Sequence, residues 1–200
     1  MSPQRSSPAN EEFPVNERDL TWVRRVREGD KDAFVEMFDW YAPKLCGFVN
    51  AHVFSRDIAE EIVQDLFLGV WVNRLVWDVP GPLRMYLYRA ALNRIANHRR
   101  GLRRELSLHS AMREHQSVIE ETTDTNAPDA QVTSRELRRS IESAVAALPD
   151  KCRQVWLLSR EHYMTYAEIA SLLDISVKTV ELHMHRAFRT LRARLKGWRS

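Results

Sequence analysis

Apolar residues recur along most of this chain at the three- to four-residue spacing of amphipathic helices, and no sustained alternation typical of strands appears. Such stripes occupy residues 20–26, 34–49, 56–71, 85–100, 134–148, 150–164 and 165–192. In the third stripe the inward positions follow at intervals of four: Ile58, Ile62, Leu66 and Val70. The pattern predicts an all-α protein.

Turn-forming residues divide the first half of the chain into separate helices. Gly29 and Asp30 separate the first two stripes, and Pro43 is suited to the first turn of a further helix. The segment VWDVPGPL, residues 76–83, carries two prolines around a glycine and must interrupt helix. We therefore expect a loop here, between two well-patterned helices.

The polar segments define the domain organisation. Residues 105–133 lose helical periodicity and include the polar run IEETTDTNAPDAQ, which predicts a flexible acidic linker. Residues 1–17 are rich in proline and serine and lack the apolar core of a secretory signal, so we expect a disordered tail. The remaining chain forms two small helical bundles, residues 18–104 and 134–200.

Composition narrows the location and the chemistry. An apolar share of 44% in 200 residues suffices for packed cores, and no run approaches 18 apolar residues, so we expect a cytoplasmic protein without direct membrane insertion. Cys46 and Cys152 are isolated and have no ligand-spaced histidines around them. They predict buried thiols and no metal site.

Charge is distributed in blocks. Residues 84–104 hold seven arginines and no acidic residue, and residues 176–200 hold seven Lys or Arg against one acid, Glu181. Between these blocks, residues 105–136 carry seven Asp or Glu against two arginines. Two basic blocks joined by an acidic spacer favour two nucleic-acid-facing modules on a tether, although each block alone could be a solvated helix face.

The segment TYAEIASLLDISVKTVELHMHRAFRTLR, residues 165–192, has the pattern of a helix-turn-helix unit. Thr165 and Glu168 have capping-box spacing, and Ser176 can cap the second helix. His183 lies beside the apolar stripe and is expected to pack there rather than to bind metal. In such a unit the second helix enters the major groove, where arginine can read guanine and glutamate can accept from cytosine, while other residues contact only phosphate. The expected DNA-facing residues are Lys178, Thr179, Glu181, Leu182, His185, Arg186 and Arg189.

Three segments together resemble the extracytoplasmic-function group of bacterial sigma factors. RDIAEEIVQDLFLGVW, residues 56–71, looks like the helix that docks on the clamp-helix coiled coil of the RNA polymerase β′ subunit. MYLYRAALNRIANHRR, residues 85–100, is similar to the helix that handles the −10 promoter element, and residues 148–192 look like the −35-reading domain. The segment TVELHMHRA, residues 179–187, favours the iron-citrate-regulator-like branch of this group.

The resemblance implies where the chain binds polymerase. Glu61, Gln64 and Asp65 occupy the matching docking positions, and Glu61 and Asp65 share one helix face at a spacing of four. A face with two acids and an amide beside large apolar groups suits a basic, partly apolar partner. Phe67 and Trp71 either extend this dock or belong to the core.

The resemblance also places the −10 site, because the family inserts a flipped −10 base into a pocket at the position of loop 76–83. An opened strand must be held by stacking and by cations along its backbone. Asn93 matches the family's asparagine in this helix. Tyr86 stands where the family often has Trp, and the loop is unusually rich in proline, so the −10 base preference is open. The expected −10 residues are Trp77, Tyr86, Tyr88, Arg89, Asn93, Arg94, Arg99 and Arg100.

Together these features predict an RNA polymerase sigma factor that recognises the −35 and −10 elements and promotes DNA melting. The implied partners are core polymerase, through its β′ clamp helices and β flap, promoter DNA and an anti-sigma factor. The family performs no covalent chemistry and uses no cofactor. The alternative is a LuxR-like helix-turn-helix regulator, which would require an α/β receiver that the first half of the sequence does not suggest. A nuclease would require clustered carboxylates beside the arginine blocks.

Overall fold

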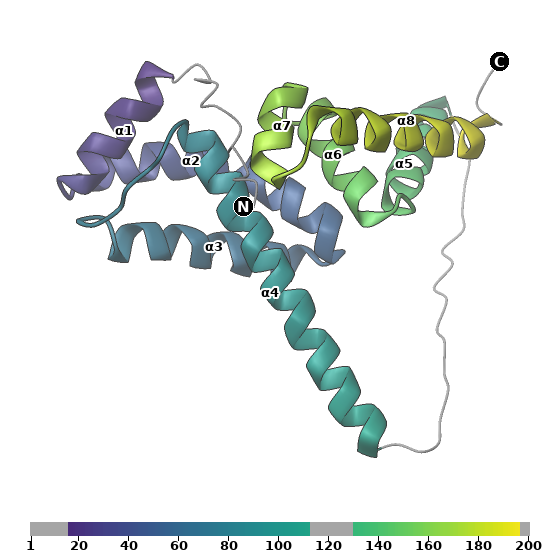
Figure 1. The fold of residues 1–200 in the computed structure, drawn as a ribbon, viewed down its shortest axis with the longest axis horizontal. Coiled ribbons are helices and arrows are strands. Elements are labelled where there is room, and N and C mark those ends of the chain that lie inside the picture. The colour runs from purple at the N-terminus through teal and green to yellow at the C-terminus, as the bar shows by residue number, and fades with distance from the viewer. Residues whose placement is uncertain (1–15, 113–129, 197–200) are drawn as a thin grey trace, which may run out of the picture.

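The computed structural model describes residues 16–112 and 130–196, and within these ranges every regular element is a helix. Figure 1 shows α1 to α4 packed as one bundle and α5 to α8 as a second, with the C-terminal part of α4 extending away from both. This confirms the predicted all-α fold of two bundles. The helices are α1 (Glu17–Arg27), α2 (Lys31–Val53), α3 (Arg56–Val72), α4 (Leu83–Met112), α5 (Ala130–Ala146), α6 (Asp150–Arg160), α7 (Tyr166–Leu173) and α8 (Val177–Arg194).

The predicted boundaries and the helix ends differ in detail. Helix α4 continues through Met112, seven residues beyond the expected start of the linker at residue 105, and α5 begins at Ala130. The central part of the expected linker and most of the expected N-terminal tail lie outside the described residues. Among the described residues, no helix is long and apolar enough to cross a membrane.

The first bundle comprises α1 to α4 around a core of large apolar side chains. Side-chain caps start three of its helices: Asn16 accepts from Arg18 N, Asp30 from Ala33 N, and Ser55 from Ile58 N. Of the inward stripe predicted for α3, Ile62, Leu66 and Val70 are buried and Ile58 is half-buried, where α3 packs on α2 and α4. Side chains with at most 1% exposure here include Met37, Leu45, Phe48, Leu66, Phe67 and Leu87.

Pro43 does not begin a new helix. It lies inside α2, which runs without a break from Lys31 to Val53. Proline removes the hydrogen bond to the carbonyl four residues earlier, that of Asp39, and Asp39 is exposed so that water can take the bond's place. Burial of Ala42 and Leu45 on either side holds the helix together. Tertiary packing therefore overrides the local preference for a helix start.

The second bundle comprises α5 to α8. The predicted capping box is present: Thr165 Oγ1 accepts from Glu168 N, and the Glu168 carboxylate accepts from Thr165 N at 2.7 Å. Asp174, at φ 53°, ends α7 in the left-handed conformation, and Ser176 caps α8 through Thr179 N. This turn sets α7 and α8 in the helix-turn-helix arrangement that the sequence predicted.

The two bundles touch. Figure 1 shows α7 lying beside the N-terminal part of α4, while the C-terminal part of α4 projects past the second bundle. Arg99, past the middle of α4, pairs with Asp150 at the start of α6. The core of the second bundle is built from α5, α6, α7 and α8, and includes Ala144, Val155, Leu157, Leu158, Ile169, Val180 and Ala187. Cys152 is buried within it and Cys46 is half-buried, and both are free thiols.

Candidate functional site

Helix α3 separates an apolar inner face from an acidic outer face. Glu61, Gln64 and Asp65 are all exposed, and they are positioned by the burial of Ile62 and Leu66 on the opposite side. Among the described residues, neither Glu61 nor Asp65 forms an ion pair. Their carboxylates therefore remain available to an external cation.

The outer face of α3 continues as an apolar surface. Leu68 and Val72 are 59% and 64% exposed, one and two turns beyond Asp65. Phe67, in contrast, is 1% exposed and belongs to the core, and Trp71 is half-buried with its ring centroid 5.0 Å from that of Phe34. The two aromatic residues therefore pack inward. The exposed apolar surface is formed instead by Leu68 and Val72, which the sequence analysis did not single out.

A groove of about 540 Å³ lies beside this face, between α2 and α3. Its floor is formed largely by small or apolar side chains, and polar groups of α3 line one edge, including Gln64. The predicted docking residue Gln64 therefore borders both the acidic face and the groove. The lining residues are Phe38, Asp39, Ala42, Pro43, Cys46, Gly47, Asn50, Arg56, Ala59, Glu60, Val63 and Gln64.

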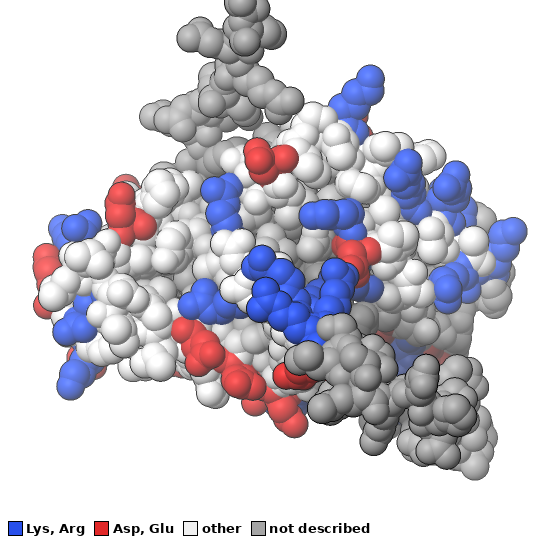
Figure 2. Space-filling view, turned by 60° about the horizontal axis from the view of Figure 1, so that its bottom comes forward, with Lys and Arg blue, Asp and Glu red and all other residues white. Residues whose placement is uncertain are grey.

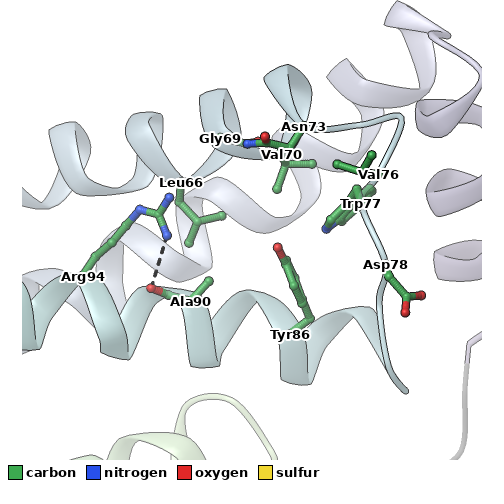
Figure 3. Close-up of a pocket in the computed structure, with 10 residues that line it drawn as sticks. All are labelled: Leu66, Gly69, Val70, Asn73, Val76, Trp77, Asp78, Tyr86, Ala90 and Arg94. Atoms are coloured by element: carbon green, nitrogen blue, oxygen red, sulfur yellow. Dashed lines mark hydrogen bonds between the residues drawn. The ribbon is translucent and has the colours of Figure 1, made fainter.

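A second hollow, of about 410 Å³, lies where the chain passes from α3 to α4 (Figure 3). Trp77 and Tyr86 face each other edge-on across it, with ring centroids 5.8 Å apart. Trp77 is only 4% exposed, and its buried Nε1 has no hydrogen-bond partner. Gly81, at φ 95°, supplies the turn that brings the loop back to α4. The interrupting loop therefore forms one wall of a pocket.

Arg94 closes the other end of this pocket. Its guanidinium group points across the gap between α4 and α3, where it contacts the carbonyl oxygens of Ala90 at 3.5 Å and Asp65 at 3.4 Å. A Cβ built on Gly69 would lie 3.2 Å from Arg94 Nη2, so the glycine gives the arginine room. The two carbonyl contacts are long, which leaves the guanidinium free to accept a better partner.

The remaining expected −10 residues divide between two sides of α4. Asn93 and Arg100 are exposed. Tyr88 is 2% exposed, Arg89 donates to a carbonyl of α7, and Arg99 pairs with an acid of α6. The structure therefore gathers Trp77, Tyr86 and Arg94 in one pocket and turns Tyr88, Arg89 and Arg99 toward the second bundle.

Helix α8 presents its polar face outward. Val180, Met184 and Ala187 are buried. His183 packs beside them with Nδ1 3.6 Å from Cys152 Sγ, and burial lowers its pKa. Thr179 is half-buried and its hydroxyl bonds that of Ser176 at 2.8 Å. The other expected DNA-facing residues are exposed: Lys178, Glu181, Leu182, His185, Arg186 and Arg189.

On the face shown in Figure 2, Lys and Arg side chains form a dense cluster with a row of Asp and Glu side chains beside it. A surface divided in this way can attract phosphate at one place and repel it at the next. In the part of the chain that the structure describes, no group of three or more His, Cys, Asp or Glu residues could hold a metal ion.

Two helical bundles, one carrying a helix-turn-helix with an exposed basic helix and the other a pocket that Arg94 borders, fit a DNA-binding protein. Sigma-70 region 2 matches residues 37–105, and Sigma-70 region 4 matches residues 138–191, together more than half of the chain. The chain belongs to the sigma-70 family of RNA polymerase sigma factors, in its extracytoplasmic-function (ECF) group.

Curated relatives span nearly the whole chain. The ECF RNA polymerase sigma factor SigW of Bacillus subtilis is 28% identical over 177 residues, covering 87% of this chain and 95% of the relative. The ECF RNA polymerase sigma-E factor of Haemophilus influenzae is 27% identical over 174 residues, covering 84% and 90%. These comparisons support the prediction of a sigma factor. They give no support to the LuxR-like alternative.

Solved structures share the fold. CnrH, in complex with the cytosolic domain of CnrY, aligns with a TM-score of 0.64 at 22% identity, covering 90% of this chain and 99% of that chain. The sigma factor RpoE from Bartonella quintana, in complex with the anti-sigma factor NepR, aligns with a TM-score of 0.61 at 21% identity, covering 82% and 96%.

Proposed function

We propose that the outer face of α3 docks the chain on core polymerase, that the pocket between α3 and α4 takes an unpaired −10 base, and that α8 reads the −35 element. The observation that carries this proposal is the order of the three surfaces along one chain: an acidic face without internal partners, a pocket with an unused hydrogen-bond donor, and an exposed basic helix. No surface alone specifies a sigma factor. Together they correspond to the three contacts that a sigma factor makes: with polymerase, with the −10 element and with the −35 element.

Docking rests on the chemistry of α3. Glu61 and Asp65 offer two carboxylates to a basic helix, and Gln64 adds a donor and an acceptor at the rim of the groove. Leu68 and Val72 extend the contact with apolar area that is otherwise exposed to water. A partner with arginine or lysine followed by apolar side chains, such as the β′ clamp helices, complements both parts.

Capture of a base rests on the pocket. An extruded base needs a snug site with aromatic or apolar walls and polar groups that meet its edge. Trp77 and Tyr86 supply the walls, and Trp77 Nε1 is a buried donor without a partner. An acceptor on the base would satisfy this donor. Arg94, held only by long carbonyl contacts, can turn to the neighbouring phosphate.

Upstream recognition rests on α8. Glu181 can accept from cytosine, Arg186 can bond guanine with two hydrogen bonds, and Lys178 near the start of the helix suits phosphate. Each bundle offers few phosphate contacts by itself, so neither should hold a promoter tightly at physiological salt. Docking on polymerase fixes the distance between them and raises the effective concentration of the second contact.

The finer assignments follow from the family. We infer that the chain performs no covalent chemistry, that the β flap of polymerase meets the second bundle, and that the protein acts in the cytoplasm, where bacterial transcription takes place. An anti-sigma factor is the expected regulator, as in the RpoE–NepR complex. The residues 179–187 favour the iron-citrate-regulator-like branch of the group.

Run-off transcription with core polymerase on a promoter library tests the function as a whole. Addition of the protein should direct initiation at a subset of promoters that core polymerase alone ignores.

A pull-down on core polymerase tests the docking face. Asp65→Ala and Gln64→Ala should each weaken binding while leaving the far-ultraviolet circular dichroism unchanged. Glu28→Ala, which removes an exposed carboxylate at the end of α1, is the matched control. Equal retention of all three variants would refute the docking face.

A further inference from the structure

The pocket between α3 and α4 has one buried polar side chain among its lining residues, that of Trp77. The indole is 4% exposed, and its Nε1 finds no hydrogen-bond partner among the described residues. A donor that loses water and gains no acceptor destabilises a fold, so such groups are rare in protein interiors. The unpaired N–H of Trp77 therefore points to an acceptor that comes from outside the chain.

The other polar groups of the pocket leave the choice of that acceptor to Trp77. An indole N–H can only donate, whereas the Tyr86 hydroxyl and the Asn73 amide can each donate and accept. Arg94 also only donates, but its guanidinium lies at the end of the hollow away from Trp77 (Figure 3). Asp78 is exposed, and its carboxylate is directed away from the hollow. Trp77 is thus the one inner group with a fixed hydrogen-bonding direction.

The edge of a base that enters such a pocket first is the edge farthest from its sugar. In thymine and guanine this edge carries a keto oxygen, which accepts hydrogen bonds. In cytosine and adenine it carries an amino group, which donates. A buried donor therefore pairs with the first two bases and opposes the second two, because two donors that face each other both lose their hydrogen bonds.

We infer that Trp77 Nε1 makes this pocket select a keto base, thymine in preference to cytosine. The inference rests on the proposed function, because it concerns the identity of the base that the same pocket takes. Tyr86 is half-buried and stands edge-on to Trp77, with ring centroids 5.8 Å apart, so its ring turns aside to let the base reach Nε1. Its hydroxyl can then accept from the ring N–H of thymine, which lies next to the keto oxygen.

The apolar walls favour thymine over the other keto base. The methyl group of thymine is adjacent to its keto oxygen, and Val70 and Val76 lie beside Trp77 in Figure 3. Guanine has no methyl group there, and its second amino group would need an acceptor. Leu66 and Ala90 complete a wall that offers only apolar side chains. Burial of one methyl group should strengthen binding of thymine over uracil by about two- to fourfold.

Selection of single-stranded oligonucleotides by the full-length protein bound to core polymerase tests this preference. With the −10 region randomised, one position should be enriched in thymine or guanine. Oligonucleotides that differ only there, with thymine, uracil, cytosine or pyrimidin-2-one, then give the affinities. Thymine should bind about tenfold more tightly than cytosine, the size expected for one buried hydrogen bond gained against one opposed. Pyrimidin-2-one lacks both the keto oxygen and the amino group, and should fall between them.

Two substitutions separate the indole N–H from the ring that carries it. Trp77→Phe keeps an aromatic wall and removes the donor, so thymine and cytosine should bind within about twofold of each other. Trp71→Phe is the matched control, since it removes a half-buried indole of the same bundle that does not line the pocket. It should retain the preference of the wild type. Far-ultraviolet circular dichroism and urea unfolding check that both variants fold.

The outcomes distinguish the base preference from the proposed function. Equal affinities of the wild type for thymine and cytosine, or enrichment of cytosine or adenine at the selected position, would overturn the preference while leaving the pocket in place. A thymine preference that survives Trp77→Phe would remove Trp77 from the reading group. If Trp77→Phe does not fold, the wild type decides alone, because equal binding of thymine and pyrimidin-2-one contradicts a hydrogen bond to the keto oxygen. Failure to retain any oligonucleotide would refute capture of a base, and the proposed function with it.

Discussion

The burial of His52 should make the stability of this protein depend on pH. Its ring is 1% exposed and lies in contact with Phe48, with centroids 4.6 Å apart. Nδ1 donates to the carbonyl oxygen of Phe48 at 2.7 Å, so the neutral ring carries its proton there, and the buried Nε2 has no partner. Burial is the largest cause that lowers the pKa of His52, and the hydrogen bond to Phe48 opposes it. The positive charges of Arg153 and Arg99 lower the pKa further, and the result is a fall from 6.5 to about 4.

A lowered pKa means that the unfolded chain binds the proton more readily than the folded one. The stabilising contribution of neutral His52 is therefore complete above pH 6.5 and is lost as the pH falls from 6.5 toward 4. Between pH 7 and pH 5 this linkage lowers the free energy of unfolding by about 2 kcal/mol, since each pKa unit corresponds to about 1.4 kcal/mol. Burial lowers the pKa of His162 to about 4 as well, so it adds to the loss in the same direction.

Urea unfolding at pH 7 and pH 5 measures this loss. His52→Gln cannot take up a proton, so its stability should fall by about 2 kcal/mol less than that of the wild type over the same interval. His185→Gln removes an exposed imidazole of α8 and should keep the wild-type dependence. If His52→Gln and the wild type lose equal stability, His52 is not the buried neutral imidazole that the structure shows.

Four further outcomes are expected. Phe67→Ala should lower the free energy of unfolding by about 3–5 kcal/mol in urea titrations, because it removes a fully buried ring from the first core; a loss below about 1 kcal/mol would contradict that packing. Thr165→Ala should cost about 1 kcal/mol by removing the cap of α7, and Thr165→Ser should restore most of it. Gly69→Ala should displace Arg94 and weaken capture of single-stranded −10 oligonucleotides by the polymerase-bound protein, with unchanged affinity counting against that pocket. Glu181→Ala should shift upstream-element preference in a selection from randomised promoters, and an identical selected sequence would remove Glu181 from the reading set.

Local signals in the sequence were sufficient for most of the helices and for several of their caps. Ser176 and the Thr165–Glu168 pair, which the sequence placed at helix starts, make their capping hydrogen bonds, and Ser55 makes one directly before the stripe at residues 56–71. These bonds join residues three apart, so spacing alone determines them. The same holds for α3, whose period places Glu61 and Asp65 opposite the buried stripe. The prediction failed at Pro43, where packing from the rest of the bundle outweighed a local preference.

Contacts between distant segments required the tertiary structure. Amphipathic periodicity identifies which face of α4 is polar, but it does not say what that face meets. The pairs Arg84–Glu168 and Arg99–Asp150 join residues 84 and 51 positions apart. Tyr88 illustrates the difference, since the sequence offered it for base stacking and the structure buries it against His162.

The sequence by itself determined the helices, their caps, the acidic outer face of α3 and the basic character of α4 and α8, because all of these depend on spacings within about two helical turns. Only the tertiary structure decided that the loop before α4 encloses a pocket, that Phe67 faces the core while Leu68 faces solvent beside the docking residues, and that arginines of α4 pair with the second bundle. Those outcomes depend on which surfaces meet when the bundles pack. The order of charged and apolar residues along the chain is the same whichever surfaces come into contact, so that order does not determine which surfaces do.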